Sequence, residues 1–207
     1  FETNVVKTLS LLDASRGCVE RFVFASSSSV YGDSEELPTT EGRCVKSPAS
    51  PYALQKSIVE DVLVQYADLY DLDSAALRFF NVYGRNQLGG SPYSTAVSAW
   101  ITAAKKRVGL RSDGDGRQSR DMVHVDDVTK ALMLAATHEG VLSGSAFNVG
   151  TGKSVFNEDV LQYVMTRYPG SVSHTAPRRP GDVMHTCADL SKVRSVLGYE
   201  PEVEFWL

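Results

Sequence analysis

Tyr52 and Lys56 lie four residues apart in this chain and follow a run of serines, Ser26–Ser29, a combination suited to proton transfer. On a helix, residues four apart project from one face, one turn from each other. An ammonium group beside a phenol favours the phenolate, so Tyr52 would act as a base near neutral pH. A hydroxyl from the serine run would share the same substrate oxygen. The alternative for Tyr52 and Lys56 is an ordinary solvated helix face.

Two local signals predict the elements that carry these groups. Residues 21–26 form a short, nearly continuous apolar run, which is typical of a parallel strand covered on both faces. Pro51 suits the first turn of a helix, and Ser50 suits its N-cap. We expect this helix to continue to about Tyr70.

The same signals along the chain predict an α/β fold. A helix over residues 4–15 and a strand over 74–80 make the first 84 residues helix–strand–helix–strand, which favours a doubly wound parallel sheet. Asp126 is the expected cap of a helix that runs to about His138. The remaining predicted elements are helices over about 93–107, 157–168 and 191–197, and strands over 122–125 and 146–149.

Composition excludes several classes of function. The 207 residues carry a net charge of −4, which gives no electrostatic reason to expect nucleic acid or an anionic membrane as a partner. No apolar run approaches the roughly 20 residues of a membrane-spanning helix. The cysteines and histidines are scattered without metal-ligand spacing, so we expect reduced thiols, no metal site and a cytoplasmic protein.

The chain resembles the extended short-chain dehydrogenase/reductase family, in particular its nucleotide-sugar epimerases and dehydratases of the UDP-hexose 4-epimerase type. The resemblance covers nearly the whole chain, and its motifs occur in the family's order. They are Glu-Thr-Asn-Val (2–5), Ser-Ser-Ser-Val-Tyr-Gly (27–32), Ser-Pro-Tyr-x-x-x-Lys (50–56), Arg-Phe-Phe-Asn (78–81), Gly-Arg-Gln-Ser-Arg-Asp-Met-Val-His-Val-Asp-Asp (116–127), Asn-Val-Gly-Thr-Gly (148–152) and Pro-Arg-Arg-Pro-Gly-Asp (177–182).

The resemblance implies a domain plan and a cofactor. Residues 1–84 match the second half of an NAD-binding Rossmann domain, and residues 85–207 match mainly a smaller mixed α/β lobe for a nucleoside-diphosphate sugar. Segments within about 116–150 are expected to return to the Rossmann sheet. The family's Gly-rich dinucleotide fingerprint is absent from this sequence. We therefore expect the chain to be the C-terminal part of a longer protein.

The resemblance also implies roles for individual residues. Tyr52 would take the proton of the sugar 4-hydroxyl, Lys56 would lower the Tyr52 pKa and hold the nicotinamide ribose, and Ser27 would bind the same sugar oxygen. Ser28 is the alternative to Ser27 for this role. Ser27 would otherwise only form the hydrogen bonds that end the strand. Other implied contacts are Thr3 and Phe80 with the cofactor, and Asn81, Arg120, Arg179, Asp182 and Thr186 with the substrate. Surface charge is the alternative for Arg120, Arg179 and Asp182.

Two serines in the motif narrow the reaction that the resemblance implies. Dehydratases of the family carry an acid and a base where this chain has Ser28 and Ser29, and elimination of water needs both. The sequence therefore favours C4 epimerisation of a UDP-hexose through a 4-keto sugar. The small Thr186 leaves room for an N-acetylated sugar or a uronic acid. The alternatives are a related reductase or dehydratase and a non-catalytic sugar-nucleotide-binding fragment.

The helices over 4–15 and 51–70 match those through which the family forms dimers. Both have apolar stripes, which agrees with a four-helix bundle across a homodimer. The alternative is that they pack only within the chain.

Overall fold

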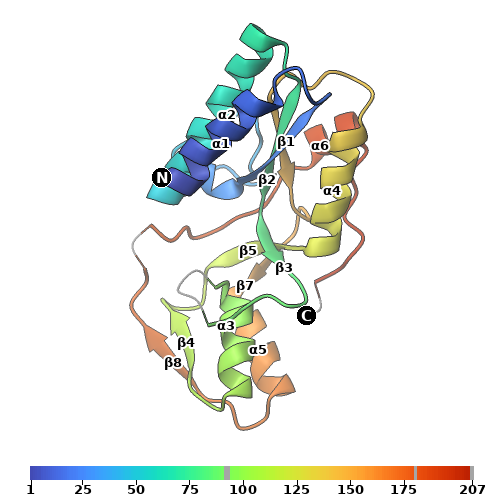
Figure 1. Cartoon of the computed structure of the whole chain (residues 1–207). Helices are drawn as coiled ribbons and strands as arrows, with labels where there is room; N and C mark the ends of the chain where they lie inside the picture. Colours follow the sequence, from blue (N-terminus) through green and yellow to red (C-terminus); the bar gives the residue numbers. More distant parts are fainter. Residues whose placement is uncertain (91–93, 180, 206–207) are drawn as a thin grey trace.

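A parallel sheet forms the centre of the larger body of the protein. The computed structural model describes residues 1–90, 94–179 and 181–205. Within these, the sheet runs in the order β1-β2-β6, with strands β1 (Phe22–Ser27), β2 (Ser74–Phe79) and β6 (Ser145–Val149). Figure 1 shows this sheet in the upper body.

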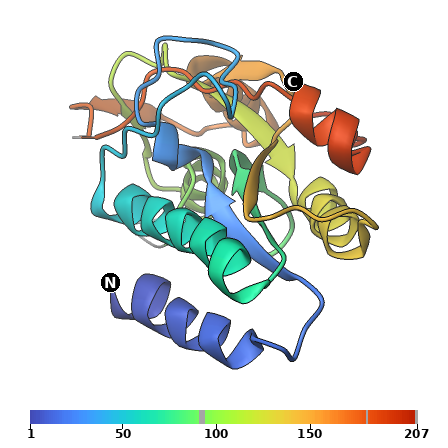
Figure 2. The same cartoon turned by 90° about the horizontal axis from the view of Figure 1, so that it is seen from above.

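Helices cover both faces of this sheet. On one face α2 (Pro51–Tyr70) contacts β1 and β2, with η1 (Glu2–Val6) and α1 (Lys7–Ser15) outside it, whereas α4 (Val125–Thr137) and α6 (Ser191–Leu197) cover the other (Figure 2). Alternation along β2 explains this arrangement, because successive side chains point to opposite faces. Ala76 packs with Leu63 of α2, whereas Leu77 packs with Ala131 of α4.

A second, smaller body follows β2 and forms the lower part of Figure 1. Trp100 and Leu110 are buried in its core together with Val160. Its elements are β3 (Asn81–Tyr83), β5 (Ser119–His124) and β7 (Ser154–Phe156) in one sheet, β4 (Leu110–Asp113) paired with β8 (Ser173–Ala176), and the helices α3 (Ala96–Lys105) and α5 (Asn157–Arg167).

The predicted bounds hold best where a cap or a stop signal is present. Helix α2 begins at Pro51, and the Ser50 hydroxyl accepts a hydrogen bond from the Ala53 amide at 3.2 Å. Helix α6 ends at Leu197, with Gly198 in the left-handed conformation. The start of the predicted helix over 93–107 lies outside the described residues.

One expectation about the middle of the chain is wrong. His124, not Asp126, caps α4, because its Nδ1 atom accepts from the Asp126 amide at 3.3 Å. Segments within about 116–150 were expected to return to the first sheet, and β6 does so. The other strand of that segment, β5, pairs with β3 and β7 in the smaller body. The described helices include none that is both long and apolar enough to cross a membrane.

Gly144 generates a prediction about stability, because it approaches α2 where a side chain has no room. Its φ is +73°, and a Cβ atom there would stand 2.7 Å from the Val64 amide nitrogen. Gly170 has a similar φ of +85° but open space around it. Gly170→Ala should lower the free energy of unfolding by about 1–2 kcal/mol through backbone strain alone. Gly144→Ala should lower it by about 1–3 kcal/mol more through overlap with the helix. Urea unfolding measures both, and equal losses would contradict the close approach.

Candidate active site

The serine run forms a tight structure at the carboxyl end of β1. Ser27 is the last residue of the strand and the N-cap of a short 3-10 helix, η2 (Ser28–Tyr31). Its Oγ atom accepts hydrogen bonds from the Ser29 amide at 3.2 Å and from the Ser29 hydroxyl at 2.9 Å. In open α/β sheets, ligands bind beyond the carboxyl ends of the strands. The Ser27 hydroxyl therefore stands where a ligand is expected.

Tyr52 meets Ser27 from the first turn of α2. Burial raises the pKa of the Tyr52 phenol above its ordinary value, and a hydrogen bond with Ser27 offsets part of this rise. The two groups come from segments far apart in the sequence, and the structure brings them together. Their contact leaves a hydroxyl pair at the edge of the sheet that is suited to one shared substrate oxygen.

Lys56 lies one turn further along α2 but does not act on Tyr52 in this arrangement. Its Nζ atom donates a hydrogen bond to the Ala25 carbonyl at 2.8 Å and stands 5.7 Å from the centre of the Tyr52 ring. Burial lowers the pKa of the Lys56 ammonium. Burial therefore dominates the Tyr52 pKa in this arrangement, and the lowering of that pKa by Lys56 stays a prediction.

Four of the residues predicted to bind substrate, Asn81, Arg120, Arg179 and Asp182, line one pocket in the smaller body. This pocket of about 360 Å³ lies among β3, β4, β5, α3 and α5. We call it the arginine pocket, after the arginines in its wall. Its wall includes the amide of Asn81 and the charged side chains of Arg111, Asp113, Arg120, Arg179 and Asp182.

Every arginine of this pocket is paired with a carboxylate. The buried Arg120 donates to Asp182 at 2.7 Å and to the Met184 carbonyl at 3.1 Å. Asp113 accepts from Arg111 at 2.7 Å and forms an ion pair with Arg179 at 2.6 Å. Burial lowers the pKa of Arg120, and Asp182 opposes this effect. The carboxylates hold these guanidinium groups in place, and a guanidinium is a planar group that can recognise an anion through two donors.

The sequence did not single out Arg111 as a ligand residue, because β4 was not predicted. A strand of four residues, Leu110–Asp113, has too few positions for a clear alternation of apolar and polar side chains. Arg111 is held by its backbone, whose carbonyl accepts from the Trp100 indole at 2.7 Å. The Arg–x–Asp spacing on a strand, with both side chains on one face, was the only available signal.

Other predicted site residues lie apart from the arginine pocket. Thr186 is not among the residues that line this pocket. Its hydroxyl accepts a hydrogen bond from the Asp121 amide at 3.1 Å. Thr3 is exposed on η1, and Ser28 lies on η2 beside Ser27. Phe80 is buried, and its amide donates to the Val149 carbonyl at 3.0 Å. These positions neither confirm nor exclude contacts of the four residues with a ligand.

With the fold and the two clusters described, comparison with known proteins defines the class. The model of the NAD dependent epimerase/dehydratase family matches residues 1–150. The UDP-glucose 4-epimerase of Mycolicibacterium smegmatis is 37% identical over 209 residues, which cover 97% of this chain and 64% of that protein. The chain therefore belongs to the NAD dependent epimerase/dehydratase family.

Solved structures agree with this assignment and with a Rossmann-like fold. The UDP-N-acetylglucosamine 4-epimerase from Methanobrevibacter ruminantium, in complex with UDP-N-acetylmuramic acid, matches with a TM-score of 0.90 and 32% identity, over 97% of this chain and 64% of that one. The UDP-glucose 4-epimerase of Thermus thermophilus, in complex with NAD, matches with a TM-score of 0.86 and 32% identity, over 99% and 67%.

The chain spans less than two thirds of the lengths of several curated relatives. The covered shares of three of them are 65%, 64% and 61%. The similarity to them therefore applies to part of each relative.

The contact between Ser27 and Tyr52 generates a prediction about titration. Ser27→Ala removes the hydrogen bond that lowers the Tyr52 pKa, so the pKa of Tyr52 should rise further. The Tyr52 signal is the part of the tyrosinate absorbance that disappears in Tyr52→Phe. Ser28→Ala is the matched control and should leave this titration unchanged. A shift in the Ser28 variant alone would identify Ser28 as the partner of Tyr52.

Proposed function

We propose that the protein is an NAD-dependent 4-epimerase of a nucleoside-diphosphate sugar, most suitably a UDP-hexose. The observation that carries the proposal is the Ser27–Tyr52 hydroxyl pair at the carboxyl edge of the parallel sheet, with Lys56 one turn away. The arginine pocket supports it, because its guanidinium groups suit a diphosphate. The names of the similar proteins support the same reaction class.

The groups around Tyr52 fit the nicotinamide end of NAD. The hydroxyls of Ser27 and Tyr52 and the Lys56 ammonium offer the donors that a ribose and an amide need, beyond the ends of parallel strands. Lys56 and Tyr52 would hold the ribose, and the backbone near Thr3 and Phe80 would flank the cofactor. When bound, NAD supplies a reversible hydride acceptor for the sugar carbon.

The protein's own residues manage the proton at the sugar 4-hydroxyl. Tyr52 removes this proton and later returns it, and the Ser27 hydroxyl positions the same oxygen. Ser29 donates to the Ser27 oxygen, so the Ser27 proton points away from Ser29 toward Tyr52 and would turn to the shared substrate oxygen on binding. For Tyr52 to act as a base its pKa must fall, and we propose that the Lys56 ammonium lowers it by leaving the Ala25 carbonyl and approaching the phenol.

At the other end of the substrate, Arg120 and Arg179 bind the diphosphate. Asn81 lines the same pocket and suits a hydroxyl or phosphate oxygen, and Asp182 suits a ribose hydroxyl. Asp113 and Asp182 already hold these arginines, so phosphate oxygens exchange with carboxylates or share the guanidinium with them. We further propose that the site accepts N-acetylated sugars or uronic acids, because the side chain of Thr186 is small.

The assignment of Tyr52 as the base generates a prediction about turnover. In the complete natural protein, Tyr52→Phe should lower epimerase turnover by about 100- to 10,000-fold, because general base catalysis contributes factors of this size. Binding of UDP-glucose should persist, as measured by calorimetry. Tyr70→Phe, the same change at the other end of α2, is the control and should keep full turnover. Unchanged turnover in Tyr52→Phe would contradict the proposal.

We also propose that α1 and α2 form the interface of a homodimer. Large apolar side chains are exposed on both helices, among them Leu11 at 57% and Val64 at 44%. The two helices lie side by side on the outside of the sheet in both views (Figures 1 and 2). Pairing with a second copy would bury this surface in a four-helix bundle.

The proposed interface generates a prediction about assembly. Leu11→Glu combined with Val64→Glu should convert a dimer to a monomer in sedimentation velocity experiments, because buried unpaired carboxylates are costly. Val172→Glu changes a valine that is 69% exposed in the smaller body, and it should leave the dimer intact. A dimer that survives the double substitution would place the interface elsewhere.

A further inference from the structure

A third residue continues the line of Tyr52 and Lys56 along α2. Glu60 follows Lys56 by one more turn, so Tyr52, Lys56 and Glu60 share one face of the helix. We call these residues the α2 row. All three are joined to β1: Tyr52 to Ser27, Lys56 to the Ala25 carbonyl, and Glu60 to the Ser26 hydroxyl at 2.5 Å. The row therefore contacts three consecutive residues of the strand from about two turns of the helix.

Glu60 differs from the other members of the row in being fully enclosed. It is 4% exposed, and Arg78 of β2 is 5% exposed. The guanidinium of Arg78 donates to Oε1 of Glu60 at 3.0 Å and to Oε2 at 2.7 Å. This bidentate geometry fixes the distance and the angle between the two planar groups. The pair therefore connects α2 to both β1 and β2 at one point.

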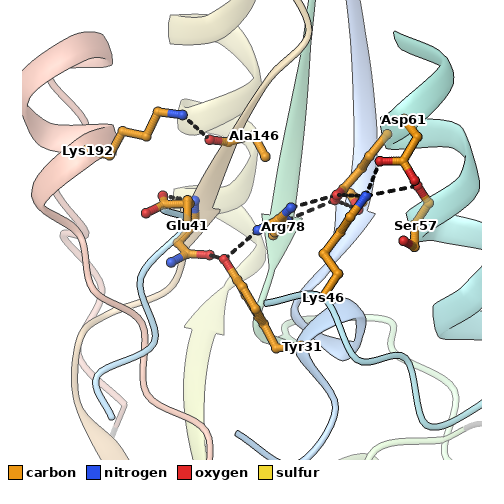
Figure 3. A network of polar contacts seen from close by, with 11 residues as sticks. Tyr31, Glu41, Lys46, Ser57, Asp61, Arg78, Ala146 and Lys192 are labelled. Carbon is orange, nitrogen blue, oxygen red and sulfur yellow. Dashed lines mark hydrogen bonds and ion pairs between the residues drawn. The ribbon is translucent and has the colours of Figure 1, made fainter. Parts of the chain in front are cut away.

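The third guanidinium nitrogen of Arg78, Nη1, extends the network across the sheet. It bonds the Tyr31 hydroxyl of η2 at 2.8 Å, and Tyr31 donates to Asn148 of β6 at 2.7 Å. Figure 3 shows Arg78 between Tyr31 and the side of α2, where Lys46 reaches Asp61 and Ser57. Tyr31 ends the 3-10 helix that Ser27 caps. The network thus holds both segments that carry the hydroxyl pair.

A buried ion pair is weak evidence for stability, since desolvation of two charges offsets most of their attraction. Burial alone would lower the pKa of Arg78, but its bonds to Glu60 and Tyr31 raise it, so the guanidinium stays charged. An apolar pair of similar volume would hold the layers together at least as well. The directional geometry of the charged pair is what apolar groups lack.

We propose that Glu60 and Arg78 are positioning residues that set the register of α2 against β1, and so hold Tyr52 against Ser27. This inference rests on the proposed function for its kinetic consequence, whereas the positioning itself is independent of the reaction. Neither residue touches substrate. Displacement of reacting groups by about 1 Å can lower a rate by about 100-fold.

The test compares two variants of the complete natural protein. Arg78→Lys keeps the charge but loses the bidentate fork. Glu60→Leu combined with Arg78→Met removes both charges and keeps the volume, which avoids an unpaired buried charge. Both variants should lower kcat for UDP-hexose epimerisation by about 100-fold with KM little changed. The Tyr52 pKa should rise in both, as in Ser27→Ala, because the Ser27 contact is lost.

Arg21→Lys is the matched control. Arg21 is likewise a largely buried arginine paired with a carboxylate, Asp73 at 2.6 Å. Its other described hydrogen bonds go to carbonyls at the end of α4 and just after it, and none of them goes to α2. It should lose stability while kcat and the Tyr52 titration stay as in the parent protein. Unchanged kcat or an unchanged Tyr52 titration in the Arg78 variants would overturn the inference. If the parent protein has no epimerase activity but the Tyr52 titration still shifts in the Arg78 variants, the positioning role is supported and the proposed function is refuted.

Discussion

The docking of α2 against β1 is the contact on which the rest of the site depends. The apolar part of this contact, Leu63 with Phe24 and Ala76, brings the helix to the sheet but permits sliding. Polar bonds from Tyr52, Lys56 and Glu60 then determine how far along the strand the helix stands. Layer packing and the placement of reactive groups thus have different physical sources in this protein. The first depends on buried area, and the second depends on direction.

The sequence predicted the elements with strong local signals and missed those without them. Helix α2 was predicted at its observed bounds because Ser50 and Pro51 mark its start in the chain itself. Strands β3, β4, β7 and β8 have three or four residues each, too short for a periodic pattern. Their pairing depends on segments distant in the sequence. His124 as the cap of α4 was also missed, because Ser, Thr, Asn and Asp dominate that position.

The site shows the same division. Ser27, Tyr52 and Lys56 were singled out from their motifs and spacing, and Arg120 and Arg179 from their place in the family motifs, whereas Arg111 was missed. The bonding state of these groups was not predictable. Lys56 bonds the Ala25 carbonyl and Asp113 joins Arg111 to Arg179, and both facts depend on which neighbours the fold brings within reach. Residue spacing describes one helix or strand at a time, whereas protonation and ion pairing depend on contacts among several of these elements.

The pairing of every arginine in the arginine pocket has a consequence for recognition. Arg111, Arg120 and Arg179 face Asp113 and Asp182, so the pocket as a whole carries little excess charge. An approaching anion is therefore attracted only weakly from a distance and must compete at contact with carboxylates already in position. A ligand must therefore displace a carboxylate from its arginine in order to bind. A single carboxylate or phosphate gains little binding free energy by replacing Asp113 or Asp182. A diphosphate, with two linked phosphates, can replace both at the cost of ordering one molecule.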